Sequence, residues 1–190
     1  MSTVWDQLEA DCLSIYSLPH NVIYLRQRFG VTPAEAARKR VADARSGLGG
    51  VATQREFVGP KLFLRVAGPT NDAYSGEWWF DPDVFHKVEG AYARVYFHSS
   101  EKKTVIRDML RELLAISTEW NNLSEVWALA LPPGERLVGY VGRGAPQQLF
   151  GNLPLAAKGN RMLVGQAEQI FFPPMHNPLW ITKYYDLRPT

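Results

Sequence analysis

The chain has 190 residues, which is long enough for a domain that buries about 70% of the surface of its unfolded chain. Apolar residues make up 46% of the sequence and charged residues 21%, and this balance excludes a disordered protein. The formal net charge is only +2, and the longest basic run is the one in ARKR at residues 37 to 40, so nucleic acid is not the expected partner.

Cysteine content and the N-terminal segment bear on where the protein is found. Because Cys12 is the single cysteine of the sequence, an internal disulfide and a cysteine-rich zinc site are excluded. Its apolar helical surroundings favour a buried, inert thiol. The N-terminal segment lacks the basic-then-apolar layout of a secretory signal, and no apolar run approaches about 18 residues. We expect a protein that is cytoplasmic where it is made, has no membrane partner and reaches another cell only through a dedicated secretion system.

Residues 1 to 47 are predicted to be helical. In the last of these helices, Thr32 is expected to be the N-cap, with Pro33 at the first helical position and Glu35 completing a capping box. Gly47 is expected to end the helix.

The glycine-rich stretch 47 to 60 has no hydrophobic period and is interpreted as a connection. We place a boundary near residue 50, which divides the chain into a helical leader (1–50) and a mixed α+β domain of catalytic type (51–190).

Beyond Lys61, short apolar runs bounded by glycine, proline, asparagine and aspartate predict the strands of a mostly antiparallel sheet. One strong helix is predicted over residues 100 to 117, with an apolar stripe and an opposite, charged face that includes Arg111 and is expected to be solvated. The stretch 143 to 161 is a long polar loop. The predicted strands are 61–67, 77–80, 93–98, 125–131, 136–142, 169–173 and 179–185.

The most recognisable catalytic signatures are missing. The sequence has no glycine-rich phosphate loop, no GxSxG elbow and no HExxH. The histidines lack metal-ligand spacing, so we expect no metal site. They are His20, His86, His98 and His176.

Polar and aromatic residues at strand ends are the remaining candidates. Arg65 lies within the apolar run LFLRVAG, where it either faces water or clamps a phosphate with its planar guanidinium. Gly76 makes a turn before Trp78, Trp79 and Phe80, and alternation sends one tryptophan to the core and leaves the other for an edge or the wall of a pocket.

The stretch VGQAEQIFFPP, residues 164 to 174, places amides and a carboxylate at the entrance of a strand. In an extended chain, Gln166 and Glu168 share a face with Ile170, while Gln169 points to the other face. Glu168 and Gln169 therefore do not both serve one pocket unless the strand bulges, and the sequence leaves the choice between them open.

In chain order, LFLRVAG, SGEWWF, LPPGERLVGYVG with its APQQ exit, and GQAEQIFF followed by the tryptophan of NPLW resemble the toxin domains that end bacterial polymorphic secreted toxins. They are also similar to the NAD-cleaving domain of tuberculosis necrotizing toxin. The resemblance covers residues 60 to 181 and implies a split-sheet fold of the ADP-ribosyltransferase type.

This resemblance implies that NAD is the substrate, cleaved between nicotinamide and ribose. In the motifs of this family, Arg65 corresponds to the arginine that holds the phosphates. Gly76, Phe80 and either Trp78 or Trp79 correspond to the wall against nicotinamide, and Gln169 corresponds to the functional glutamine. Only Gly165 remains of the family's triple glycine, whereas QAE at residues 166 to 168 resembles the Gln-x-Glu element of arginine-modifying ADP-ribosyltransferases. A glutamate beside the ribose would favour transfer of ADP-ribose to an acceptor, whereas a glutamine would suit attack by water. The implied macromolecular partners are a protein acceptor, a carrier or a cognate immunity protein.

Two other classes of function stay open. The chain is also compatible with a non-enzymatic immunity or regulatory protein, whose partner surface is formed by the helix at 100–117 and the aromatic strands. Alternatively, residues 24 to 45 form a small helix-turn-helix that binds duplex DNA.

Overall fold

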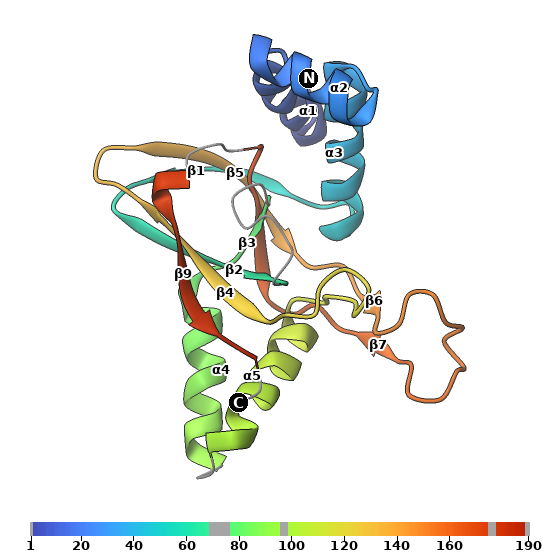
Figure 1. Ribbon diagram of the computed structural model, residues 1–190, viewed down its shortest axis with the longest axis vertical. Coiled ribbons are helices and arrows are strands. Elements are labelled where there is room, and N and C mark those ends of the chain that lie inside the picture. Colours follow the sequence, from blue (N-terminus) through green and yellow to red (C-terminus); the bar gives the residue numbers. More distant parts are fainter. Residues whose placement is uncertain (1, 69–76, 96–98, 175–177, 189–190) are drawn as a thin grey trace.

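The computed structural model describes residues 2–68, 77–95, 99–174 and 178–188. Three helices lie at one end of the molecule and two at the other, with antiparallel sheets between them (Figure 1). The predicted α+β class, with N-terminal helices followed by a sheet domain, is therefore confirmed. The helices are α1 (Val4–Tyr16), α2 (Pro19–Phe29), α3 (Pro33–Gly47), α4 (Pro82–Val95) and α5 (Ser99–Leu113), with a 3-10 turn η1 at Pro178–Trp180. The strands are β1 (Thr53–Val58), β2 (Lys61–Ala67), β3 (Trp78–Trp79), β4 (Glu125–Leu131), β5 (Arg136–Arg143), β6 (Gln147–Gln148), β7 (Met162–Leu163), β8 (Glu168–Phe171) and β9 (Ile181–Asp186).

Helix α3 begins and ends at the residues that the sequence predicts. The Thr32 hydroxyl accepts a hydrogen bond from the Glu35 amide, and the Glu35 carboxylate accepts one from the Thr32 amide. Pro33 occupies the first turn, where its missing N–H costs nothing, and Gly47 is the last helical residue.

The strands form a four-stranded sheet in the order β1-β5-β8-β3 and a three-stranded sheet in the order β2-β4-β9. Neighbouring strands in both sheets run antiparallel. A bridge between Leu64 and Phe80, whose amides and carbonyls bond at 2.9 and 2.8 Å, links the two sheets. This bridge brings β2 beside β3, so residues from both sheets meet at one place.

Strand β1 corrects the prediction of a patternless connection. It pairs along its whole length with β5, from Thr53 opposite Val141 to Val58 opposite Arg136. Within β1 only Phe57 is buried, because the strand is an edge with one partner. Polar edge strands lack the pattern of apolar residues by which a strand is recognised in a sequence.

The predicted strand at 93–98 is also wrong, since residues 93 to 95 belong to α4 and 96 to 98 lie outside the described residues. The helix begins after Asp81, whose carboxylate accepts a hydrogen bond from the Asp83 amide at 3.0 Å. An aspartate followed by proline is a helix-start signal, and it outweighs the β-branched and aromatic residues near the helix end.

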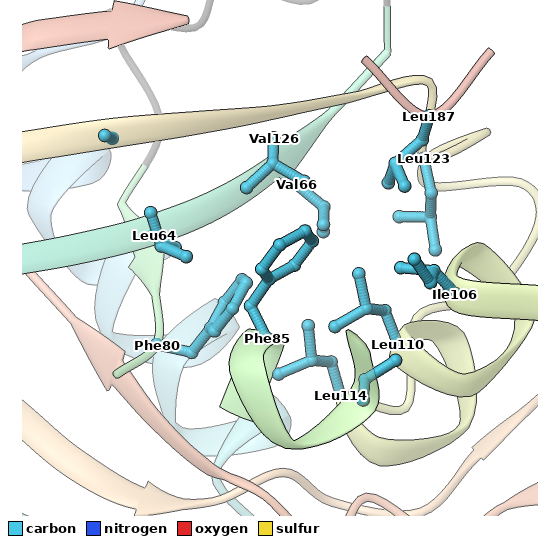
Figure 2. Packing of buried hydrophobic residues seen from close by; sticks show 12 residues of the cluster. Leu64, Val66, Phe80, Phe85, Ile106, Leu110, Leu114, Leu123, Val126 and Leu187 are labelled. Atoms are coloured by element: carbon cyan, nitrogen blue, oxygen red, sulfur yellow. The ribbon is translucent and has the colours of Figure 1, made fainter. Parts of the chain in front are cut away.

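A core fills the space between β2 and β4 on one side and α4 and α5 on the other. Figure 2 shows the side chains of this core pointing toward one another, with Phe85 of α4 between the sheet and α5. The apolar stripe of α5 is used here, because Ile106 and Leu110 are fully buried.

The leader packs on the other sheet. Leu8, Cys12 and Ala44 share a buried cluster with Tyr140 of β5 and Phe171 of β8. Cys12 is buried as expected, and burial raises the pKa of its thiol to about 12, so it stays protonated and unreactive near neutral pH. None of the helices in the described part of the chain is both long and apolar enough to cross a lipid bilayer.

Candidate functional site

A cavity of about 190 Å³ opens where β2, β3 and β8 meet the ends of α3 and α5. It is lined by residues that lie far apart in the sequence and that belong to both sheets. Among them are five of the eight sequence-predicted site residues, namely Arg65, Trp78, Trp79, Phe80 and Gln169.

Arg65 extends from β2 into the cavity lining. It lies opposite Trp127 of β4 and is half-buried, on the strand face that also carries the buried Phe63. Burial raises the pKa of Glu77, and the positive charge of Arg65 acts in the opposite direction. Arg65 thus lies between core and solvent, and its guanidinium contributes positive charge to the cavity wall.

The aromatic wall comes from β3 and the residue after it. Trp79 and Phe80 are 1% and 2% exposed, whereas Trp78 is partly exposed and meets the ring of Phe171 edge to face at 5.2 Å. The Trp78 ring also lies on Gly47, where any Cβ would overlap it. The last residue of the leader helix is therefore part of the wall.

Gln169 contributes the amide on the opposite side. Its Nε2 donates a hydrogen bond of 2.7 Å to the carbonyl oxygen of Leu114, just beyond α5, where helix carbonyls lack helical partners. Gly144 makes room, because a Cβ there would overlap Nε2 of Gln169. The side-chain nitrogen is thus held by the end of the helix, and Gln169 lines the cavity.

Glu168 and Gln166 are not brought to this cavity. Glu168 is exposed and forms an ion pair of 3.3 Å with Arg55 of β1, on the face of the sheet that also carries Phe57 and Ile170. Gln166 is also exposed and does not line the cavity, and Gly76 lies outside the described residues. Strand alternation separates Glu168 from Gln169 as the sequence indicated, and the strand presents the amide to the cavity.

The third wall, residues 114 to 121, was not identified from the sequence. Arg111, expected on a solvated face, is 8% exposed and donates hydrogen bonds to the carbonyls of Ile116 and Asn121 at 2.8 and 3.0 Å. Burial lowers the pKa of this guanidinium. Ala115 lies in the left-handed region with φ of 47°, a conformation that costs about 1 kcal/mol for a residue with a Cβ. A buried arginine thus fixes a strained turn against the cavity.

Behind the aromatic wall is a half-buried ion pair. Glu77, which is 7% exposed, pairs with Arg40 of α3 at 3.0 Å, and Arg40 also donates a hydrogen bond of 3.0 Å to the Tyr16 hydroxyl. Burial raises the pKa of the Glu77 carboxyl, and Arg40 opposes that rise. The leader therefore supports the residue that directly precedes Trp78.

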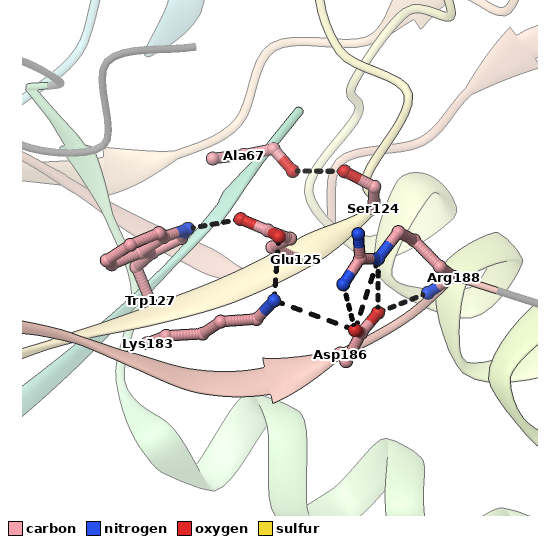
Figure 3. Close-up of polar contacts among 7 residues, drawn as sticks. All are labelled: Ala67, Ser124, Glu125, Trp127, Lys183, Asp186 and Arg188. Atoms are coloured by element: carbon pink, nitrogen blue, oxygen red, sulfur yellow. Dashed lines mark hydrogen bonds and ion pairs between the residues drawn. The ribbon is translucent and has the colours of Figure 1, made fainter. Parts of the chain in front are cut away.

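A second polar cluster lies where β4 begins and β9 ends, and its charged side chains pair with one another (Figure 3). Lys183 bonds Glu125 at 2.7 Å and pairs with Asp186 at 3.6 Å, and Asp186 also pairs with Arg188. A hydrogen bond from Lys183 lowers the pKa of Glu125, and hydrogen bonds from Arg188 lower the pKa of Asp186. Such a closed network ties down the end of a sheet.

Acidic, histidine and cysteine side chains do not gather into a metal-binding group anywhere in the described ranges. His86 of α4 shares a hydrogen bond of 3.1 Å with the Tyr184 hydroxyl. His98 and His176 lie outside the described residues.

Comparisons with known proteins add little to this geometry. No family model matches the chain, and neither does any curated protein. Among solved structures, the chain is similar to a chain in the structure of Rhs1-CT in complex with cognate immunity protein RhsI1, with 12% identity and a TM-score of 0.37, over 71% of this chain and 78% of that chain. A TM-score of this size supports no argument about function, which has to come from the cavity itself.

Proposed function

We propose that the cavity binds NAD and that the protein cleaves the bond between nicotinamide and ribose. The observation that carries this proposal is the meeting of Arg65, Trp78 and Gln169 in one hollow. A guanidinium is suited to a pyrophosphate, an indole to a flat heteroaromatic ring, and an amide oxygen to a ribose hydroxyl.

The chemistry asks little of the protein beyond orientation and electrostatics. The bond from ribose C1′ to the pyridine nitrogen breaks, its electron pair goes to nicotinamide, and the ribose passes through an oxocarbenium-like state. Water then adds its oxygen to C1′ and releases a proton, which gives ADP-ribose. Gln169 would position the ribose, and Trp78 would hold the leaving ring in the geometry for cleavage.

Hydrolysis is favoured over transfer of ADP-ribose to a protein acceptor. A glutamate beside the ribose would polarise an acceptor, but Glu168 is paired with Arg55 outside the cavity. Gln169 lines the cavity instead, and among the described residues of its lining there is no carboxylate that could act as a base. Water is thus the simplest acceptor for this arrangement.

Release of nicotinamide tests the proposal directly. We expect the wild-type protein to convert NAD to nicotinamide and ADP-ribose, as measured by mass spectrometry, and Arg65→Ala to reduce the rate by about 100-fold, the size of effect seen for a lost transition-state contact. Arg55→Ala is the matched control, because Arg55 is an exposed arginine outside the cavity. Absence of release above the Arg65→Ala level would overturn the proposal.

A second candidate function is binding of a protein partner such as a carrier or an immunity protein, and α2 supplies the observation for it. Ile23, Tyr24 and Phe29 are 57%, 52% and 59% exposed, and the two rings meet edge to face at 5.7 Å. The helix α5, expected to form such a surface, instead places its apolar stripe in the core. A stable complex lost in Ile23→Ser, with no thermal shift on adding NAD, would favour this function over the first.

A further inference from the structure

A second hollow, of about 370 Å³, adjoins the cavity beside β6 and the loop that joins β6 to β7. Trp120 and Gln147 line both hollows, so the two lie next to each other at these side chains. We infer that the second hollow binds the adenine base of the dinucleotide, stacked on the Trp120 indole. The identity of the ligand rests on the proposed function, but a purine site at Trp120 is testable by itself.

Size is the first reason. The main cavity, at about 190 Å³, is smaller than the roughly 300 to 1,000 Å³ of pockets that enclose drug-sized ligands. It suits a nicotinamide ring with its ribose rather than a whole dinucleotide. The remaining half has to lie elsewhere, and the adjoining hollow shares Trp120 with the main cavity.

Trp120 is an exposed ring on a fixed backbone. It is 59% exposed, although its segment is tied to the loop by a bond from the Thr118 amide to Leu149 O at 3.0 Å. Glu119 adds a second tie, because its carboxylate accepts from the Asn152 amide at 2.6 Å. Stacking of a base on such a pre-positioned ring costs little ordering of the protein.

The polar groups of the hollow suit a neutral base. Gln147 and Gln148 are half-buried in β6 and line it beside Ser117. An amide both donates and accepts, which matches the adjacent amino group and ring nitrogen of adenine. None of the described residues that line this hollow is charged, so phosphates would lie nearer to Arg65 in the main cavity.

The test uses fragments of the dinucleotide as probes. Binding of AMP, nicotinamide mononucleotide and NAD to the full chain is measured by calorimetry for the wild type and for Trp120→Ala. We expect Trp120→Ala to weaken AMP and NAD by at least about tenfold, as loss of one base stack does, and to weaken nicotinamide mononucleotide by a smaller factor. Trp120→Phe should retain most of the AMP affinity. Phe29→Ala, which removes an equally exposed ring from α2, should change none of the three.

The outcomes separate this inference from the proposed function. If the wild type binds AMP in a Trp120-dependent way but releases no nicotinamide, the purine site stands and NAD cleavage falls. If Arg65→Ala no longer binds nicotinamide mononucleotide, while Trp120→Ala binds AMP and NAD like the wild type, NAD binding stands and the adenine site is overturned. A wild type that does not bind AMP also overturns the adenine site.

Discussion

Two polar regions of this protein use buried side chains in opposite ways. At the junction between the leader and the sheet, the Tyr140 hydroxyl donates to Asp11 at 2.6 Å and accepts from Gln54, while Arg40 pairs with Glu77. In the cavity, by contrast, polar side chains from distant strands line an accessible hollow.

The difference shows which region holds the fold together and which one is available for a ligand. Polar groups that satisfy one another stabilise the docking of one element on another, because each would be costly to leave buried and unpaired. Polar groups that border a hollow beside aromatic rings are the usual mark of a ligand site. Substitutions at the junction should therefore change stability, and substitutions in the cavity should change activity.

Gly47→Val should have the largest effect, since Gly47 belongs to both regions. Its side chain would overlap the Trp78 ring, so the leader or the aromatic wall has to move. We expect a loss of about 3 kcal/mol in the free energy of unfolding, at the upper end for overpacking, together with loss of NAD binding. Gly90→Ala is the control: a Cβ on this residue of α4 meets nothing within 4 Å, so stability should rise slightly. Retained NAD binding in Gly47→Val would show that the leader does not shape the wall.

Arg40→Ala should cost about 2 kcal/mol, less than a fully buried pair, because the Arg40 side chain is 37% exposed. The loss should depend on pH. Burial already raises the pKa of Glu77 in the folded state, and removing Arg40 raises it further. A raised carboxyl pKa means that stability is fully present below the unfolded value and is lost as pH rises through the folded one. Urea unfolding should therefore show a larger deficit near pH 8 than near pH 5, and a deficit independent of pH would contradict this assignment.

Tyr140→Phe should have the smallest effect, about 1 to 2 kcal/mol, because it removes one hydroxyl that bonds a carboxylate and leaves the packed ring in place. Thermal unfolding measures the loss, and the rate of nicotinamide release should match the wild type. A fall in that rate without a change in melting temperature would mean that junction and cavity are coupled.

Much of the fold could be predicted because local signals agreed with tertiary structure. The capping box at Thr32 and the apolar runs of β2 and β8, bounded by turn residues, were sufficient to locate those elements. The polar edge strand β1 has no such run, and the run ARVYFH, which has the composition of a strand, begins within α4. Both errors came from weighing composition above pairing and capping.

The residues that line the cavity could be predicted from the sequence only in part. Arg65 stood out because it interrupts an apolar strand and Gln169 because it stands at the entrance of one, and strand alternation also separated Gln169 from Glu168. Arg111 and Trp120 could not be assigned by period, since their roles depend on the turn that follows α5. A lone tryptophan in the polar stretch STEWNNLS was the one available signal for Trp120.

Adjacent substitutions in β8 give the most direct test of the account. Gln169 lines the cavity, and its neighbour Glu168 lies outside it, so the two share a strand but not a role. Nicotinamide release from NAD should fall by about 100-fold in Gln169→Ala and stay within about twofold of wild type in Glu168→Ala, with both proteins folded at the assay temperature by circular dichroism. Equal rates for the two variants, or a loss confined to Glu168→Ala, would contradict the claim that this cavity is where NAD is cleaved.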